Sequence, residues 1–344
     1  EISLGLVGSE MCIRDRSESV RAYQEFLIGL SSLTVAAKNH SIVNGLVSHI
    51  EQRNDVDSEV PCVMIIALVE GRYKVSIPFD EFYQKNPIDM ATVNMETKAG
   101  REEYVNRCAT MAAKLYSLNV PMVITTIQVD ESTDAEAGVP AYVIVASRKA
   151  ALDIIEEANY GDRPNGDGPR IQEGDFVRAQ ITSVARDSIA VVVGGVDTRV
   201  SLHALTFEYL VDARTKYKVG QEIMVQVEQI IKEKDGHHIV EVNCKQPELE
   251  RAKQMRSALP IGSIVFGIVS SVAASKKQPG NINVLAYIKM YDLPVLVNNM
   301  PAKFLGSEPP RGSTVRLKVL NYLDNGMILC RCIGTQGPMN FPNA

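Results

Sequence analysis

The hydrophobic pattern of the chain consists mainly of short runs in which Val and Ile alternate with polar residues. Gly, Pro and Asn bound these runs, which is typical of short β-strands joined by turns. Three hexapeptides share one pattern, apolar-Val-x-small-x-[Val/Ile]: "IVNGLV" (42–47), "FVRAQI" (176–181) and "IVFGIV" (264–269). A pattern repeated in this way indicates repeated structural units. We predict three first strands, one in each of three units.

The small residue of each hexapeptide is Gly45, Ala179 or Gly267. Where a strongly coiled barrel strand bends across the barrel, a large inward side chain would clash with the opposite wall. The pattern therefore favours barrels over open sheets.

A second repeat, "GQEIMVQV" (220–227) and "GSTVRLKV" (312–319), begins 43 and 47 residues after Val177 and Val265. The segments "SIAVVVGG" and "TRVSLHAL" in the second unit, and "NVLAYIKM" and "LPVLVNN" in the third, supply strands two and three. Five short strands within about 75 residues are typical of an OB-fold barrel.

In the first unit, "VPCVMIIALVEGRYKVSIPFDEF" supplies strands two and three, and "AYVIVASRKAAL" supplies the closing strand. Between them, "REEYVNRCATMAAKLYSL" places Tyr104, Cys108, Met111 and Leu115 on one helical face. We therefore predict a mainly β fold, with tandem five-stranded OB-fold barrels and an inserted amphipathic helix in the first.

Composition shifts and turn residues divide the chain further. Residues 1–16, which contain "GLVGSEMCIRDR", resemble a translated sequencing-adaptor scar and are left out of the fold prediction. The "NYGDRPNGDGP" segment reads as a Gly/Pro/Asp hinge, and "PELERAKQMRSALP" as a helical spacer. The predicted organisation is an N-terminal helical segment (17–39), a divergent OB-like domain (40–158), a linker (159–169), a second barrel domain (170–246), a helical spacer (247–258), a third OB-like domain (259–334) and a disordered tail (335–344).

Composition places the 344-residue chain among globular proteins, since 45% of its residues are apolar and 22% are charged. It has no apolar run of the roughly 20 residues that span a bilayer, and its start does not resemble a secretion signal. We expect a cytoplasmic location with no membrane partner. Six scattered cysteines without zinc spacing are expected to be reduced thiols, namely Cys12, Cys62, Cys108, Cys244, Cys330 and Cys332.

Charge is unevenly distributed along the chain. Residues 1–169 carry 15 Lys and Arg against 25 Asp and Glu, residues 170–247 carry 10 against 11, and residues 248–344 carry 11 against 5. A polyanion would be drawn to the C-terminal third, whereas the acidic first domain suits a protein partner. The alternative is that the third domain is basic by chance.

The second unit resembles the S1 motif, an OB-fold RNA-binding module. The matching residues are Gly174-Asp175, Val177-x-Ala179-x-Ile181, Val191-x-Val193-Gly194-Gly195-Val196-Asp197, Val200-Ser201-Leu202 and Gly220 to Val227. The resemblance is most specific over 170–247 and weaker over 259–334 and 40–152. The whole arrangement also resembles tandem S1-type proteins of bacterial conjugative elements and phages.

The resemblance implies that the outer face of strands one to three holds single-stranded RNA, with aromatic rings that stack on bases and cations that meet phosphates. Alternation places Phe176, Arg178, Gln180 and Thr182 on this face, with Ala190 and Val192, then Arg199 and Ser201, as neighbours across the sheet. The sequence departs from the family where Asp187 and Ala190 replace common aromatics and Ser201 replaces a common His. Phe176 either stacks on a base or packs in the core, and Arg178 and Arg199 either meet the ligand or are solvated charges. The candidate nucleic-acid-binding residues are Phe176, Arg178, Gln180, Arg199, Ser201, His203, Lys218, Phe266, Lys276, Lys277 and Lys289.

Other chemical features of the sequence are weaker. Asp153, Glu156 and Glu157 have helical spacing, which fits either a metal cluster or, more commonly, a solvated helix face. Adjacent Asp80 and Glu81 point to opposite sides of a strand and cannot form an acid/base pair, and His237-His238 reads as an exposed turn. There is no phosphate loop, nucleophile elbow or zinc spacing, so we predict no enzymatic activity, cofactor or metal ion.

The sequence thus favours non-catalytic binding of single-stranded nucleic acid, RNA or else DNA, with a further protein partner on the acidic first domain. The alternative is a protein-interaction or virion-associated module, or a mobile-element accessory, whose barrels have little nucleic-acid affinity. A third hypothesis is a regulatory fragment of a nuclease whose catalytic part precedes this sequence.

Overall fold

A computed structural model describes residues 24–53, 62–130, 141–163, 168–276, 278–301 and 309–336. The predicted adaptor-like start, Lys277 and the tail beyond Gln336 lie outside these residues. Contacts divide the chain into two units, Glu1–Ala158 and Asn159–Ala344. Within the described ranges, no helix has both the length and the apolar character needed to cross a membrane.

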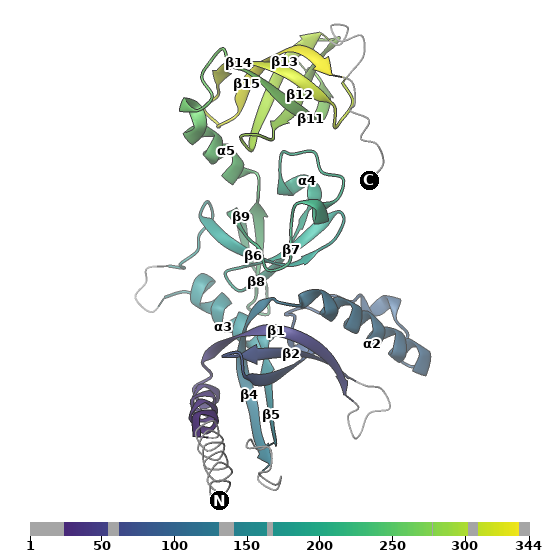
Figure 1. The fold of residues 1–344 in the computed structure, drawn as a ribbon, viewed down its shortest axis with the longest axis vertical. Helices are drawn as coiled ribbons and strands as arrows, with labels where there is room; N and C mark the ends of the chain where they lie inside the picture. Colours follow the sequence, from purple (N-terminus) through teal and green to yellow (C-terminus); the bar gives the residue numbers. More distant parts are fainter. Residues whose placement is uncertain are drawn as a thin grey trace, which may run out of the picture. The chain divides into compact units, whose positions relative to one another are not determined.

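The first unit contains a closed five-stranded barrel with the strand order β1-β2-β3-β5-β4 (Figure 1). A parallel pairing of Ser76 with Val145 joins β3 to β5. The strands are β1 (Ile42–Arg53), β2 (Cys62–Val69), β3 (Tyr73–Pro78), β4 (Asn119–Asp130) and β5 (Ala141–Ser147). The predicted strands two, three and five are therefore confirmed.

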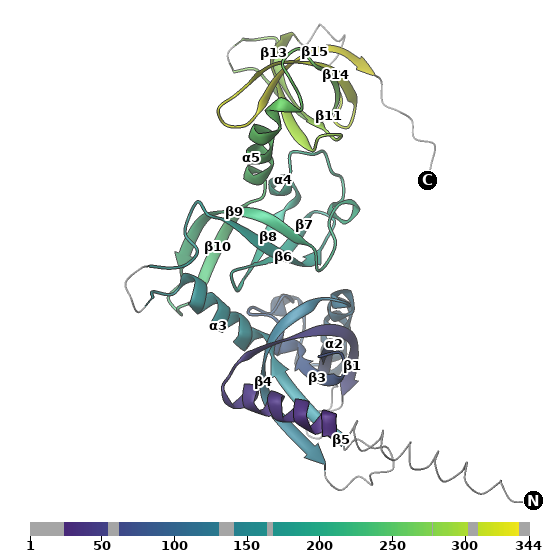
Figure 2. The same ribbon diagram turned by 60° about the vertical axis from the view of Figure 1, so that its left-hand side comes forward.

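Helices cover parts of the first barrel. A helix over residues 24–38 lies beside β5 (Figure 2), where the Tyr73 hydroxyl donates to the Phe26 carbonyl oxygen at 3.0 Å and the rings of Phe26 and Tyr142 lie 5.2 Å apart. The other helical segments of this unit are η1 (Phe79–Glu81), η2 (Met90–Thr92), α2 (Lys98–Ala112), η3 (Ala113–Leu115) and α3 (Arg148–Tyr160).

The predicted inserted helix is α2, which begins after Thr97, whose side chain accepts a hydrogen bond from the Gly100 amide. Val105, Cys108 and Ala112 are buried and recur at helical spacing, so one side of the helix covers the barrel. Of the four residues predicted to share this face, Cys108 and Leu115 are buried, whereas Tyr104 and Met111 are half-buried.

The second unit begins within α3 and contains two further five-stranded sheets. The first of these has the order β10-β9-β6-β7-β8. Its elements are β6 (Phe176–Val184), β7 (Ser188–Val193), β8 (Val196–Ser201), α4 (Leu202–Leu205), η5 (Ala213–Thr215), β9 (Glu222–Lys232) and β10 (His238–Asn243). We refer to it as the second barrel, because it is nearly closed.

A β-bulge changes the alternation along β6. The register with β7 shifts between Ile181 and Ser183, so Thr182 points inward and is only 2% exposed. The prediction that Thr182 faces outward is therefore wrong, since an extra residue in one strand reverses the faces of those that follow.

The core of the second barrel recruits two residues that the sequence placed elsewhere. Tyr160, at the end of α3, is 5% exposed, and its hydroxyl donates to the Val193 carbonyl oxygen at 2.9 Å. His238 is buried at the start of β10 with its ring 5.5 Å from that of Tyr160. His238 is thus not in an exposed turn, and α3 runs two residues into the segment predicted as a linker.

The third barrel is closed, with the order β11-β12-β13-β15-β14. Its elements, with the preceding helices, are α5 (Gln246–Gln254), η6 (Met255–Ser257), β11 (Ile264–Ala274), β12 (Asn281–Ile288), β13 (Leu293–Pro301), β14 (Thr314–Tyr322) and β15 (Ile328–Gln336). The steric argument for a small residue in the first strand is confirmed, because a Cβ on Gly267 would lie 2.9 Å from Leu317 Cδ1, and one on Gly45 would lie 2.7 Å from Met122 Cε.

The second and third barrels meet through buried polar groups carried partly by α5. Glu248 is 6% exposed and accepts hydrogen bonds from the Thr206 hydroxyl at 2.5 Å and the Phe207 amide at 3.0 Å. Burial raises the pKa of Glu248, although these donors and Lys216 oppose the shift. The helix is thus more than a spacer, since it fixes a carboxyl group between two barrels.

Asp292, in the turn between β12 and β13, is the second centre of this junction. Lys216 of the second barrel lies 2.7 Å from Glu208 Oε2 and 3.8 Å from Asp292 Oδ1. The Tyr287 hydroxyl donates to Asp292 at 2.6 Å, and Arg251 of α5 forms an ion pair with it. Burial opposes ionisation of Asp292, but these three partners outweigh it and lower its pKa.

Candidate nucleic-acid interface

The outer surface of the second barrel is divided because β6 bends between two neighbours. Its first half pairs with β9, so Phe176 lies opposite Gln226 and Arg178 lies opposite Met224. Its second half pairs with β7, where Gln180 lies opposite Val192. The predicted neighbours of Phe176 and Arg178 on β7 are therefore replaced by residues of β9.

Phe176 is 41% exposed and lies on the surface rather than in the core. Arg178 is also exposed, and its guanidinium lies 3.5 Å from the Glu222 carboxylate. Both partners of this pair are largely solvated, with side-chain exposures of 79% and 59%, so the pair contributes little to stability and can exchange for another anion. The first half of β6 thus presents one aromatic ring and one cation to solvent.

Arg199 extends from β8 on the same sheet. It lies opposite Ala190 of β7. Its guanidinium donates from Nε at 3.1 Å and Nη2 at 2.9 Å to the Ser188 hydroxyl, which itself donates to Asp187 at 3.1 Å. These bonds orient Arg199 without a direct carboxylate partner among the described residues.

The remaining candidates of the second barrel lie near its strand ends. Ser201 is exposed and pairs with Ser188 across β7 and β8, and His203 is exposed in α4. Lys218 is exposed in the loop before β9, which is held to β6 by a bond from the Gly220 amide to the Ile181 carbonyl oxygen at 2.8 Å.

The candidates of the third barrel are dispersed. Phe266 is 53% exposed on β11, and Lys276 is exposed after that strand. Lys289 lies in the turn after β12, 4.0 Å from Glu208, so it adjoins the junction between the barrels. The sequence reasoning missed Arg316 and Lys318 of β14, which lie beside β11; their alternation with buried Val and Leu in "GSTVRLKV" was the signal that could have found them.

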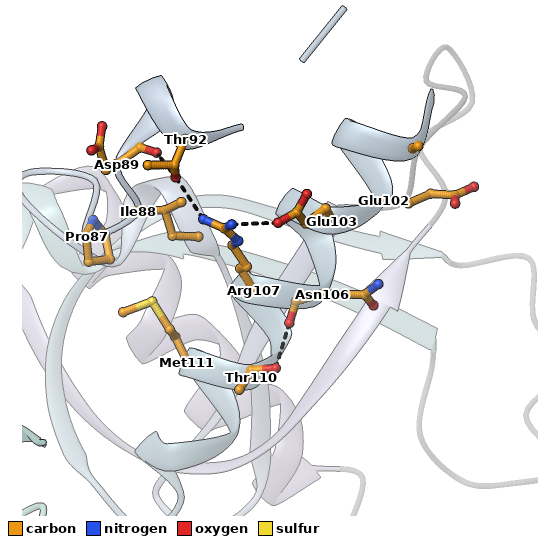
Figure 3. A pocket seen from close by; sticks show the side chains of 11 residues that line it. Pro87, Ile88, Asp89, Thr92, Glu102, Glu103, Asn106, Arg107, Thr110 and Met111 are labelled. Atoms are coloured by element: carbon orange, nitrogen blue, oxygen red, sulfur yellow. Dashed lines mark hydrogen bonds and ion pairs between the residues drawn. The ribbon is translucent and has the colours of Figure 1, made fainter. Parts of the chain in front are cut away.

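The first unit presents a different surface. A groove of about 670 Å³ lies between α2 and residues 87–92 (Figure 3). Arg107 crosses it, donating to the Thr92 hydroxyl at 2.8 Å and to Glu103 at 2.5 Å. With Asp89 and Glu102 also on its walls, the groove is acidic on balance and repels phosphates.

Two of the three carboxylates that suggested a metal cluster, Asp153 and Glu156, make structural contacts in the first unit, whereas Glu157 is exposed. Glu156 is 4% exposed and accepts a hydrogen bond from Gln84 Nε2 at 3.0 Å, and the same nitrogen lies 3.3 Å from Asp153 Oδ1. The prediction of a solvated helix face is therefore wrong for Glu156. Asp80 and Glu81 lie in η1, so the prediction that they lie on a strand is wrong. Asp80 accepts from the Tyr104 hydroxyl at 2.9 Å, while Glu81 accepts from Ser147 at 2.6 Å, so the two carboxylates face different partners.

Comparison with known proteins identifies one matching family model. Residues 170–238, which form most of the second barrel, match the S1 RNA binding domain. This match supports nucleic-acid binding by that part of the chain. None of the curated proteins matches the chain.

Several solved structures resemble the chain weakly. The a/eIF2alpha-aDim2p-rRNA complex from Pyrococcus horikoshii OT3 has 17% identity and a TM-score of 0.20, covering 26% of this chain and 59% of that one. A multidomain protein with nucleic acid binding domains from Streptococcus pneumoniae TIGR4 has 11% identity and a TM-score of 0.20, covering 86% and 74%. A murine DNA binding protein bound to double-stranded DNA has 14% identity and a TM-score of 0.17, covering 48% and 92%. The chain thus spans 59% of the first of these structures, and such low TM-scores carry no conclusion about its ligand.

Proposed function

We propose that the chain binds single-stranded nucleic acid without catalysis, with RNA preferred over DNA, through the barrels of its second unit. The observation that carries the proposal is the S1 match over 170–238, which covers the barrel whose surface presents Phe176 and Arg178. An exposed ring can stack on a base, and an Arg whose ion pair is solvated can transfer to a phosphate.

The scarcity of aromatics limits the strength of each contact. Base stacking contributes about 1–3 kcal/mol per base, and among the candidates of the second barrel Phe176 is the one Phe, Tyr or Trp. Binding by that barrel should therefore depend mainly on phosphate contacts, and we expect a strong dependence on salt.

A second proposal assigns the first unit to a protein partner. The acidic groove beside α2 supports it, because Asp89, Glu102 and Glu103 line an open surface that suits a basic segment better than a nucleic acid. If this is the main function, the barrels are an interaction module with little affinity for nucleic acid.

Fluorescence anisotropy with labelled oligouridylate and oligothymidylate, titrated at several salt concentrations, separates the two proposals. Saturable binding with tighter affinity for oligouridylate supports the first. If neither oligonucleotide binds at low salt, the proposal of nucleic-acid binding is refuted and the protein-interaction function remains.

The double variant Arg178→Gln and Arg199→Gln tests the second barrel as the site. If both side chains meet phosphates, the slope of log Kd against log salt should fall by about 1.4, because each single-strand contact contributes about 0.7. The matched control is Arg214→Gln with Lys232→Gln, two exposed cations outside β6, β7 and β8. Equal affinity of the two double variants would remove Arg178 and Arg199 from the site.

A further inference from the structure

Strand β14 presents two cations on the outside of the third barrel. Val315, Leu317 and Val319 are buried in the barrel, whereas the alternating Arg316 and Lys318 are exposed. The same alternation continues on the neighbouring strand β15, where Arg331 is exposed between two buried cysteines. A row of outward positions on adjacent strands therefore carries three positive charges.

The strand register places apolar side chains beside these cations. Phe266 of β11 lies directly opposite Arg316, and Ile264 lies opposite Lys318. On the other edge of β14, Lys318 lies opposite Arg331. Directly opposed residues have Cβ atoms about 4.5–5.5 Å apart, so an exposed ring and three cations form one continuous surface. We call this surface, made of Ile264, Phe266, Arg316, Lys318 and Arg331, the basic face.

No acidic residue compensates the basic face from within its own strands. The sequences of β11, β14 and β15 contain no Asp or Glu. In the described part of the chain, none of Arg316, Lys318 and Arg331 takes part in an ion pair or a side-chain hydrogen bond. Three like charges on adjacent positions repel one another, so the face costs stability that a bound polyanion would recover.

The other two barrels show that the fold does not require this arrangement. At the position equivalent to the Phe266–Arg316 pair, the second barrel has Arg178 opposite Met224, with Glu222 paired to the Arg. The first barrel has the uncharged pair Asn44 and Pro121. The basic face is therefore a property of the third barrel alone among the described strands.

Strands β12 and β13 of the third barrel contain no charged residue. On β12 and β13, the second and third of the strands where the S1 resemblance placed the ligand, Leu285 lies opposite Leu296, and the outward positions on either side are Asn283 and Asn298. Phosphates would find no cation on these two strands, since neither contains Lys or Arg.

We propose that the basic face is a second contact for single-stranded nucleic acid, in which Phe266 stacks on a base while Arg316, Lys318 and Arg331 meet phosphates. This inference rests on the proposed function, and it places the site in the third barrel on β11, β14 and β15 rather than on β11, β12 and β13. An exposed ring beside unpaired cations matches the two needs of a single strand, a stacking platform and a neutralised backbone.

The experiment uses the full chain and labelled oligouridylate, with anisotropy measured over a range of salt. Arg316→Gln with Lys318→Gln keeps the aliphatic stems and should lower the slope of log Kd against log salt by about 1.4. Phe266→Leu keeps apolar bulk but loses the ring, and should weaken binding by roughly fivefold to a hundredfold with the slope unchanged. The matched control, Lys234→Gln with Arg311→Gln, removes two exposed cations outside these strands. Unchanged melting temperatures confirm that the variants fold. If the double variant does not fold, the single variant Lys318→Gln replaces it and should lower the slope by about 0.7.

The outcomes separate this inference from the proposed function. If the native chain binds oligouridylate and the basic-face variants behave like the matched control, the second contact is refuted while the proposed function stands. If the native chain binds no single strand at low salt, both fail. Competition by oligoglutamate as strong as that by oligouridylate at equal charge would show a surface for acidic protein and overturn the assignment to nucleic acid.

Discussion

Glu248 combines burial, two hydrogen-bond donors and a raised pKa, which makes it a sensitive residue for stability. A carboxyl group whose pKa is higher in the folded state than its ordinary 4.5 binds a proton on folding within the window between the two values. Stability should therefore fall as pH rises from 4.5 through the raised pKa, and should stay level above it.

Replacing Glu248 should separate its charge from its hydrogen bonds. Glu248→Gln retains an acceptor for the Phe207 amide and removes the buried charge, so unfolding at neutral pH should become no easier and the pH dependence in this window should vanish. Glu248→Ala leaves two buried groups unsatisfied and should cost about 2–4 kcal/mol. Urea unfolding of both variants at several pH values is the measurement. A native-like pH profile in Glu248→Gln would show that another group is responsible.

Cysteine reactivity should follow exposure. Cys62 is exposed, whereas burial raises the pKa of Cys108 to about 11 and those of Cys244 and Cys330 to about 12. Because the thiolate is the reactive form, a thiol reagent at mildly alkaline pH should label Cys62 quickly and the buried thiols only after unfolding. The test is a labelling time course with mass spectrometry in a Cys12→Ser background. Equally fast labelling of Cys330 would contradict the closed third barrel.

At the scale of the strand, Gly267 tests the close approach that the repeated hexapeptide predicts. A Cβ there would meet Leu317 at 2.9 Å and Ala286 at 3.4 Å, so Gly267→Val should overpack the barrel and cost about 1–3 kcal/mol. Gly334→Ala on β15, where no atom lies within 4 Å, is the control and should change stability little. Thermal unfolding measures both, and equal melting temperatures would show that the strand can move aside.

The strands were predictable because alternation and turn residues are local properties of the sequence. The outward orientations of Phe176 and Arg178 followed from the same alternation. The inward position of Thr182 was not predictable, because the bulge after Ile181 depends on pairing with another strand. The basic face was missed for a different reason: Arg316 lies on the fourth strand of its barrel, whereas the S1 resemblance directed attention to the first three.

The contacts between the second and third barrels could not be predicted from the sequence either. Glu248 read as one charge of a helical spacer, and nothing local shows that Thr206, distant in the chain, would donate to it. Likewise, Tyr160 and His238 are buried because the fold brings the end of α3 beside the start of β10. Tertiary contacts of this kind override local preferences for exposure.

At the scale of the molecule, the burial of Tyr160 determines where a stable fragment containing the second and third barrels should begin. A fragment that begins at Gly168 loses this buried ring, at a cost of roughly 3 kcal/mol, whereas one that begins at Arg148 keeps it. The shorter fragment should melt about 5–10 °C lower. Calorimetry of the two fragments, both ending at Gln336, tests this, and Tyr160→Ala in the longer fragment should reproduce the loss. Equal melting temperatures would show that Tyr160 adds little to the second barrel.

The polar junction also determines how strand length enters binding. The second and third barrels are joined at several points by Glu248, Asp292 and Lys216. The distance between the proposed binding surfaces of the two barrels should therefore vary less than it would across a flexible linker. An oligonucleotide shorter than this distance can contact one barrel, and a longer oligonucleotide can contact both. The affinity for an oligonucleotide should therefore rise in a single step at one length when the oligonucleotide is lengthened by one nucleotide at a time.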